Sequence, residues 1–206
     1  MLIEQIPNIV RWVYWRALWR GATNEKVIYL TIDDGPTKSG TQWILDLLDK
    51  YGIKATFFCI GKNVEMNSEL YNEILRRGHK TGVHGYDHKR GLNSNSKAFY
   101  ADIEHASQFI RSNLFRPPHG NISLSQLREL SKRYTVVLWD VITRDYNQNL
   151  SGDDVLNIAK KYSRNGSIVV FHDSEKSMKN MRYALPKAIE YWLTEGYEFR
   201  RLGVES

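Results

Sequence analysis

Thr31-Ile32-Asp33-Asp34-Gly35-Pro36 ends an apolar run, residues 27–30, and together they predict a buried strand followed by a turn. Gly35 and Pro36 end the strand, because glycine permits a sharp turn and proline has no N–H to donate to a sheet. Two carboxylates therefore lie side by side at the end of a rigid element. Their repulsion requires a partner, which is a metal ion, a cationic side chain or one shared proton.

Beyond this stretch, predicted strands and helices alternate. Strands are expected at 27–33, 54–60, 80–84, 114–116, 135–141, 167–171 and 197–202. Helices are expected between them at 42–51, 68–77, 98–113, 123–132, 153–163 and 182–194. This alternation indicates βα units and a parallel sheet. The 206 residues show no repeat or linker, so one α/β domain is expected, as a barrel or an open doubly wound sheet.

Residues 1–24 stand apart from this alternation. Residues 8–20 combine near-helical apolar spacing with three tryptophans and three arginines. The arginines interrupt any signal-peptide core, and no stretch reaches the ~20 apolar residues of a spanning helix. The default expectation is therefore a cytoplasmic or peripheral membrane protein. The amphipathic helix either packs across the end of the domain or lies at a membrane surface.

Charge and cysteine content exclude further classes. The formal charge is +6, but the basic residues are scattered and no groove-entering motif occurs, so nucleic acid is not an expected partner. The single cysteine, Cys59, cannot form an internal disulfide and fits a buried apolar position. A monomer is expected.

Nearly every predicted strand ends in ionisable residues. Chemistry in parallel α/β folds gathers at the carboxyl ends of the strands. If these charges were only surface residues, they would be spread along the helices as well, so the clustering favours an enzyme. The residues at these ends are Asp33, Asp34, His84, His88, Arg116, His119, Asp140, Asp145, His172 and Asp173.

His84 and His88 have a spacing that brings two imidazoles to one side of a turn. With one aspartate of the 33–34 pair they form a His, His, Asp set, as in catalytic zinc sites with an open position. The other aspartate could then take a proton from a water whose pKa the metal lowers. Taken alone, the histidine pair is equally compatible with two solvated loop residues.

Arg116 and His172 each lie at the end of a predicted strand, and for each a role without chemistry is the alternative to a catalytic one. Two prolines after Arg116 restrict the backbone, so its guanidinium could hold a carboxylate by a bidentate contact, although a surface arginine has the same pattern. His172 follows a buried strand, where many histidines are simply core residues. A carboxylate neighbour, Asp145 or Asp173, would raise its pKa and favour the acid form.

Five motifs in order resemble the polysaccharide deacetylase family with its NodB-type domain (carbohydrate esterase family 4). They are 31–36, His84-x-x-x-His88, Arg116-Pro-Pro-x-Gly120, Trp139-Asp140 with the later Asp145, and the strand ending in His172-Asp173. The resemblance covers about residues 25–203. It implies a distorted (β/α) barrel of seven or eight strands in a single domain at 25–206, and metal-dependent removal of acetyl groups from N-acetylated, or in some members O-acetylated, sugars.

The resemblance also implies a metal site and a base. Asp34, His84 and His88 would bind one divalent metal, expected to be Zn²⁺ with Co²⁺ or Ni²⁺ as substitutes. Asp33 would be the general base, oriented by Arg116, as a metal-bound water attacks the acetyl carbonyl.

The remaining roles concern the oxyanion, the acid and the acetyl pocket. The His119 backbone N–H would stabilise the oxyanion, and His172, tuned by Asp145, would protonate the leaving amine. The pocket is expected to include Trp139 together with Tyr146 and Val170.

This sequence departs from the family pattern at three positions. Gly85 replaces the serine or threonine that follows the first metal histidine, which removes a hydroxyl that braces the loop. Tyr146 and Val170 replace a tryptophan and a leucine, so the pocket shape would differ. The alternatives are a non-catalytic carbohydrate-binding member, and a deacetylase of a lipid-linked sugar or another small amide.

Overall fold

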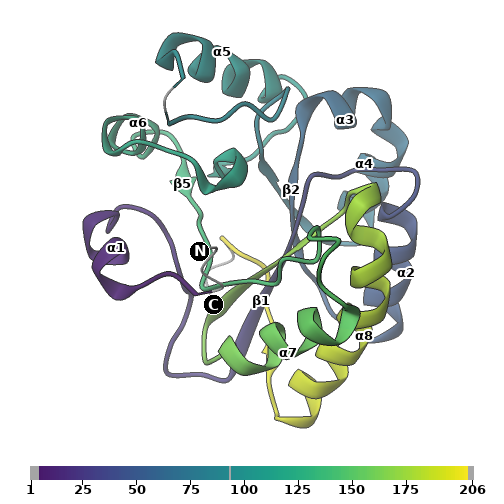
Figure 1. Cartoon of the computed structure of the whole chain (residues 1–206). Coiled ribbons are helices and arrows are strands. Elements are labelled where there is room, and N and C mark those ends of the chain that lie inside the picture. The colour runs from purple at the N-terminus through teal and green to yellow at the C-terminus, as the bar shows by residue number, and fades with distance from the viewer. Residues whose placement is uncertain (1–4, 93, 204–206) are drawn as a thin grey trace.

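The computed structural model describes residues 5–92 and 94–203, whose strands form one sheet (Figure 1). The described strands are β1 (Val27–Asp33), β2 (Thr56–Cys59), β3 (Lys80–Val83), β4 (Leu114–Phe115), β5 (Thr135–Val136), β6 (Val141–Ile142), β7 (Ser167–His172) and β8 (Glu198–Phe199). Their order is β5-β4-β3-β2-β1-β7-β6, and β8 pairs with the start of β1. All these pairs are parallel, which confirms the predicted α/β fold of βα units. The predicted N-terminal segment and domain extend into residues 1–4 and 204–206, which lie outside the described residues.

Helices connect the strands and lie around the outside of the sheet (Figure 1). They are α1 (Asn8–Val13), α2 (Thr41–Lys50), α3 (Gly61–Met66), α4 (Ser68–Arg76), α5 (Ser96–Ala106), α6 (Leu124–Leu130), α7 (Gly152–Tyr162) and α8 (Met178–Thr194), with the short 3₁₀ turns η1 (Pro118–Gly120) and η2 (Glu175–Ser177). All of β1 except Tyr29 is buried, and its Ile28, Leu30 and Ile32 side chains share one core cluster with those of α2 and α8. Burial contributes roughly 1.5–3 kcal/mol for each large apolar side chain. The acidic pair at the end of β1 therefore stands on a rigid base.

The stretch predicted as one strand, 135–141, links the two edges of the sheet. That prediction is wrong in its middle, because the stretch holds both β5 and β6, which pair with different neighbours. The Val137 N–H donates to Phe115 O, which ends β4, at 2.8 Å, whereas the Asp140 N–H donates to Ile168 O in β7 at 3.0 Å. The chain thus crosses from one edge of the sheet to the other, which produces the distorted barrel.

The N-terminal segment is helical over a shorter range than predicted. α1 ends at Val13 instead of residue 20, and none of its residues is buried. Leu18 then pairs with Val137, and Arg20 pairs with Ser167. Because these strand residues satisfy the backbone of the segment, tertiary pairing overrides the helical spacing of its side chains. Within the described ranges, no helix combines the length and apolar content that a bilayer span requires.

Other element boundaries differ by a few residues from the prediction. α3 is absent from the prediction, because Val64 is its only buried residue with an apolar side chain and six residues reveal no periodicity. α5 ends at Ala106 instead of residue 113, and α8 begins at Met178 instead of residue 182. Ser123 caps α6 in a reciprocal pair of hydrogen bonds with Gln126.

Candidate active site

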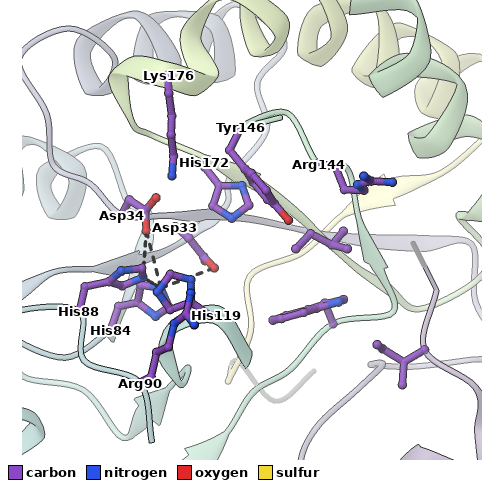
Figure 2. A pocket seen from close by; sticks show the side chains of 13 residues that line it. Asp33, Asp34, His84, His88, Arg90, His119, Arg144, Tyr146, His172 and Lys176 are labelled. Atoms are coloured by element: carbon purple, nitrogen blue, oxygen red, sulfur yellow. Dashed lines mark hydrogen bonds and ion pairs between the residues drawn. The ribbon is translucent and has the colours of Figure 1, made fainter. Parts of the chain in front are cut away.

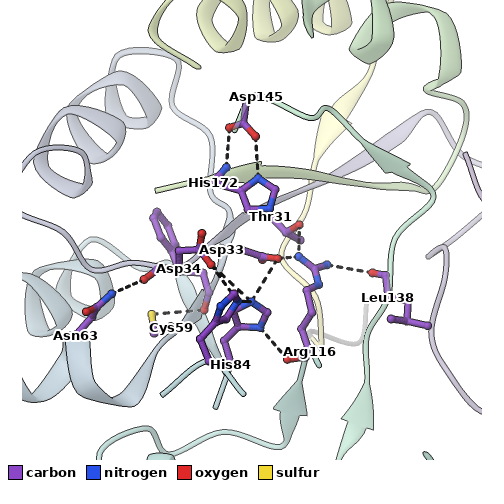
Figure 3. Close-up of polar contacts among 12 residues, drawn as sticks. Thr31, Asp33, Asp34, Cys59, Asn63, His84, Arg116, Leu138, Asp145 and His172 are labelled. Carbon is purple, nitrogen blue, oxygen red and sulfur yellow. Dashed lines mark hydrogen bonds and ion pairs between the residues drawn. The ribbon is translucent and has the colours of Figure 1, made fainter. Parts of the chain in front are cut away.

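Five strands deliver polar side chains to the same end of the barrel (Figure 3). Asp33 ends β1 and His172 ends β7, and the two residues are direct partners in the parallel register. The other three follow β3, β4 and β6 and are His84, Arg116 and Asp145. These groups are distant in sequence but lie together, because the carboxyl ends of all strands in a parallel sheet meet at one edge.

Asp33 is held by a buried arginine. The Arg116 Nη1 donates to Asp33 Oδ1 at 2.6 Å and to Thr31 Oγ1 at 2.8 Å, and Nη2 donates to Leu138 O at 3.0 Å. Asp33 is 3% exposed and Arg116 is fully buried. The contact uses a single nitrogen and is not bidentate. It fixes one oxygen of Asp33, while the second oxygen, Oδ2, lies 3.9 Å from His84 Nε2.

Asp34, His84 and His88 form a compact set of candidate metal ligands (Figure 2). One ligand atom of each lies within 4.8 Å of the others. The Asp34 Oδ1 is 3.4 Å from His88 Nε2 and 3.7 Å from His84 Nε2, and the two Nε2 atoms are 3.2 Å apart. Within the described ranges, this is the group of three or more such side chains that could share one ion.

The protonation of this set fits a cation. The His84 Nδ1 lies 2.7 Å from Arg116 O, so it carries the proton and donates it, which leaves the Nε2 lone pair facing the set. Burial lowers the pKa of His84 and of His88 to about 3, which keeps both imidazoles neutral. Burial raises the pKa of Asp34 to about 6, and a nearby positive charge would reverse that rise. Two imidazole nitrogens and one carboxylate oxygen match the ligands that zinc prefers.

A buried aspartate braces the loop between the two histidines. The Asp102 carboxylate, on α5, accepts hydrogen bonds from the backbone N–H of Tyr86 at 2.9 Å and of Asp87 at 3.0 Å. Gly85 has a φ of +75°, and a Cβ there would meet Asp102 Oδ2 at 2.6 Å. A side chain at residue 85 would therefore displace the brace. Asp102 is a supporting residue that sequence reasoning missed, since nothing marks an acid in mid-helix as facing this loop.

His172 is oriented by Asp145, one of its two candidate partners. The fully buried Asp145 accepts from His172 Nδ1 at 2.7 Å and from the His172 backbone N–H at 2.8 Å. Burial by itself lowers the pKa of His172, but the charge and hydrogen bond of Asp145 outweigh it and raise the pKa to about 9. Asp173 instead binds the hydroxyls of Thr37, at 2.6 Å, and Thr41. Asp173 is thus occupied in positioning the start of α2.

The backbone around the site is strained. Four non-glycine residues in the described chain have a left-handed φ: Asp34 at 78°, His88 at 58°, His119 at 59° and Arg144 at 60°. All four line the same cavity. Such conformations cost on the order of 1–3 kcal/mol each and persist where surrounding contacts impose them. Their concentration here indicates that side-chain placement at this cavity outweighs local backbone preference.

The cavity has a volume of about 510 Å³ (Figure 2). It is lined by Ile6, Asp33, Asp34, His84, His88, Arg90, His119, Trp139, Ile142, Arg144, Tyr146, His172 and Lys176. Arg116 and Asp145 lie behind this surface. Val170, expected in the pocket, is fully buried in β7 and does not line the cavity, where Ile142 appears instead. Ile6, Arg90, Arg144 and Lys176 were not predicted. Ile6 lies in the N-terminal segment, and the other three lie two to seven residues beyond the end of a strand.

Asp140, also named among the strand-end acids, serves elsewhere. It is fully buried and accepts hydrogen bonds from Arg11 Nη2 at 2.5 Å, Arg164 Nη2 at 2.9 Å and Ser167 Oγ at 2.7 Å. Burial by itself raises its pKa, but these donors lower it to about 2. Asp140 therefore anchors the N-terminal segment to the barrel and is absent from the cavity wall.

Comparison with known proteins adds a family to this geometry. Residues 20–138 match the sequence profile of a family described as polysaccharide deacetylase. The chain is 33% identical over 189 residues to a peptidoglycan-N-acetylglucosamine deacetylase of Bacillus cereus, and the match covers 88% of each chain. Other curated relatives are longer, and the chain spans 30% or 38% of their length.

Solved structures share the fold. The crystal structure of the Bc1960 peptidoglycan N-acetylglucosamine deacetylase, in complex with 4-naphthalen-1-yl-N-oxidanyl-benzamide, has a TM-score of 0.85 and 29% identity, covering 93% of this chain and 94% of that one. A BA3943 mutant, described as a CE4 family pseudoenzyme with restored enzymatic activity, has a TM-score of 0.80 and 25% identity, covering 89% of this chain and 68% of that one.

Proposed function

The chain belongs to the polysaccharide deacetylase family of hydrolases, and we propose that it removes acetyl groups from the N-acetylated sugars of a peptidoglycan-type glycan. One observation carries the proposal. A single cavity holds a carboxylate with two neutral imidazoles and, beside them, a second carboxylate with a charged imidazole. The first group, Asp34, His84 and His88, suits a divalent cation, and Asp33 and His172 suit proton transfer.

Asp34, His84 and His88 would hold one cation, which we expect to be Zn²⁺, with Co²⁺ or Ni²⁺ as substitutes. When bound, the ion supplies Lewis acidity towards the acetyl carbonyl and lowers the pKa of water. Of the two aspartates, Asp34 is the better ligand, because its Oδ1 is within 3.7 Å of both imidazole nitrogens.

Asp33 would act as the general base. Its Oδ1 is engaged by Arg116, which leaves Oδ2, on the side of His84, to accept the proton of an attacking water. The oxygen of that water forms the new bond to the acetyl carbon. The backbone N–H of His119, on the cavity wall, is the proposed donor to the carbonyl oxygen as it becomes negative.

His172 would act as the general acid. Because Asp145 holds Nδ1, the second nitrogen, Nε2, is available to donate its proton to the leaving nitrogen. The C–N bond then breaks, the amine leaves neutral and acetate remains. The same transfer would serve the oxygen of an O-acetyl group, so O-acetylated sugars are second candidates. Trp139, Ile142 and Tyr146 supply apolar walls for the acetyl group.

A non-catalytic, carbohydrate-binding role is the alternative from another class. A pseudoenzyme with this fold makes the alternative concrete. In this chain, however, every ionisable residue proposed for the reaction is retained. A binding protein has no need of a histidine held charged beside a buried carboxylate.

Incubation with N-acetylated chito-oligosaccharides or peptidoglycan fragments should release acetate. Dialysis against a chelator should lower the rate by at least about 100-fold, because the ligand set loses the charge that polarises the carbonyl. One equivalent of Zn²⁺ should restore it. Acetate is measured by a coupled assay, with His105→Ala as control for an imidazole outside the cavity. Hydrolysis that persists after exhaustive chelation would contradict the metal site, and no acetate from any substrate with Zn²⁺ present would support the binding role.

We propose in addition that the segment around α1 rests on an anionic lipid surface. Its apolar side chains are open to solvent: Ile9 is 68% exposed, Val10 37%, Trp12 75%, Val13 41% and Trp15 68%. The Arg16 guanidinium lies 4.4 Å from the Trp15 ring centroid, and the chain carries a formal charge of +6. Exposed aliphatic and tryptophan side chains beside arginine are typical of an interfacial segment. Ile6 lines the cavity, so this surface begins beside the site, and a lipid-linked sugar is a candidate substrate.

Flotation with liposomes tests this contact. The full chain should float with vesicles of phosphatidylcholine and phosphatidylglycerol, and the variant Ile9→Asn/Trp12→Ser/Trp15→Ser should float at least about tenfold less, since it loses most of the exposed apolar area. The matched control is Leu75→Asn/Leu92→Ser/Leu124→Ser, whose leucines are 44%, 44% and 49% exposed elsewhere. Equal flotation of both variants and the original chain would disprove the contact, as would no flotation at all.

A further inference from the structure

Two basic side chains on the cavity wall, Arg90 and Lys176, have no function in the reaction proposed above (Figure 2). Neither forms a hydrogen bond or an ion pair with any residue that the structure describes, and the Lys176 Nζ lies 5.6 Å from the Tyr146 ring centroid. The neighbouring Lys89 differs, because it pairs with Asp87 and with Asp102, each at 3.3 Å. Arg90 and Lys176 therefore keep their charges available at the cavity.

The carboxylates at the site are already engaged. Asp33 pairs with Arg116 at 2.6 Å, and Asp145 pairs with His172 at 2.7 Å. Asp34 belongs to the candidate metal set, where a cation would neutralise it. The wall therefore presents an excess of positive charge to whatever fills the cavity.

The two cations come from separate loops and line the same cavity. Arg90 follows β3 and the histidine pair, whereas Lys176 lies in η2 after β7. Figure 2 shows them on opposite sides of the candidate metal set. Both line the cavity that also holds Asp33, Asp34 and His172. Their charges therefore face the molecule whose acetyl group would be attacked there.

A neutral acetamido sugar gives such cations little to bind. Its hydroxyl and amide oxygens can accept hydrogen bonds from the two cations, but they carry no negative charge to neutralise them. A carboxylate or phosphate held between an arginine and a lysine would satisfy both.

We propose that Arg90 and Lys176 recognise an anionic group that the substrate carries close to its acetamido group. The inference rests on the proposed deacetylase function and deepens it. The preferred substrate is then an acidic N-acetylated sugar, with the negative charge on a carboxylate or on a phosphate ester, and neutral N-acetylglucosamine oligosaccharides are poorer substrates.

Two matched pairs of substrates, each with one charged and one neutral member, test this. The first pair is an acetylated disaccharide with a lactyl carboxylate on the ring and its neutral methyl ester. The second is the N-acetylated sugar with a phosphate diester at the anomeric position and its uncharged alkyl glycoside. The ratio of kcat/KM, charged over neutral, should be at least about tenfold with one pair, and the pair that gives the larger ratio identifies the anion. Raising the salt concentration should lower the ratio.

Variants locate the effect. Arg90→Gln and Lys176→Gln should each lower the ratio several-fold, and the double variant should bring it close to one. Lys176→Arg should preserve it, because the charge is kept. Lys179→Gln is the control, since this exposed lysine is near in sequence but does not line the cavity. Thermal unfolding of each variant checks that the fold is retained.

The outcomes separate this inference from the underlying function. A ratio of one for both pairs, with the neutral substrates hydrolysed, would overturn the anion site and leave the deacetylase intact. Acetate from none of the four substrates would instead reject the function. A ratio unchanged in the double variant, with weaker inhibition by acetate, would assign the two cations to the product and overturn the inference.

Discussion

Asp33→Asn should lower kcat for acetyl hydrolysis by about 10²–10⁴-fold, the range for loss of a general base, while one Zn²⁺ per chain still binds. Asparagine has the same shape and can still accept from Arg116 Nη1, but it takes no proton from water. Asp34, His84 and His88 are unchanged, so the candidate ligand set is complete. The measurements are kcat under saturating Zn²⁺ and metal content after gel filtration.

The neighbouring carboxylate provides the matched control. Asp34→Asn keeps the proposed base but replaces the charged ligand, so it should weaken Zn²⁺ binding strongly and regain activity as the metal concentration rises. The two adjacent substitutions should therefore separate a loss of proton transfer from a loss of metal. Near-normal turnover of Asp33→Asn would refute the base assignment, and full Zn²⁺ content in Asp34→Asn would refute the ligand assignment.

Sequence reasoning succeeds where strand geometry constrains the answer. Asp33 and His172 are register partners because they end neighbouring parallel strands, and His84 and Arg116 follow the strands beside them. Each of these side chains is within two residues of a strand end. The sheet therefore determines their placement, and the apolar runs that precede them reveal the sheet.

Sequence reasoning fails where the position of a side chain depends on which distant residue binds it. Asp140 lies within the crossing stretch and Asp145 follows it, yet Asp140 binds Arg11 and Arg164, whereas Asp145 binds His172. No local pattern shows which arginines approach a given acid. The sequence predicts too long an N-terminal helix for a related reason. Leu18 and Arg20, at the end of the predicted range, pair with residues that lie more than a hundred positions away in sequence.

Loop residues escape prediction for another reason. Arg90 and Lys176 lie in segments whose path depends on distant contacts, such as the Asp102 brace of the loop after β3. Loop conformation is poorly encoded in local sequence. Charge could have identified these residues only after the barrel had shown which loops surround the site.

Asp145→Asn should move the alkaline limit of activity to lower pH. In the original chain the pKa of His172 is about 9, so the proton needed by the leaving amine is present below that pH and lost above it. Asparagine removes the main charge that opposes the effect of burial. The charges of the nearby Asp33 and Asp34 still raise the pKa of His172. A bound cation cancels the contribution of Asp34. The pKa should therefore fall towards the ordinary 6.5.

The sign of the effect distinguishes this role from a merely structural one. At pH 8 the variant should lose at least about tenfold in kcat/KM and should recover part of that loss as the pH falls, because His172 regains its proton. Profiles of kcat/KM between pH 5 and 10, with an NMR titration of His172, measure the shift. Asp173→Asn is the control, since Asp173 binds Thr37 and Thr41 and leaves the partner of His172 intact. A variant equally impaired at every pH would mean that Asp145 only holds the loop in shape, and His172 would then lose its support as the acid.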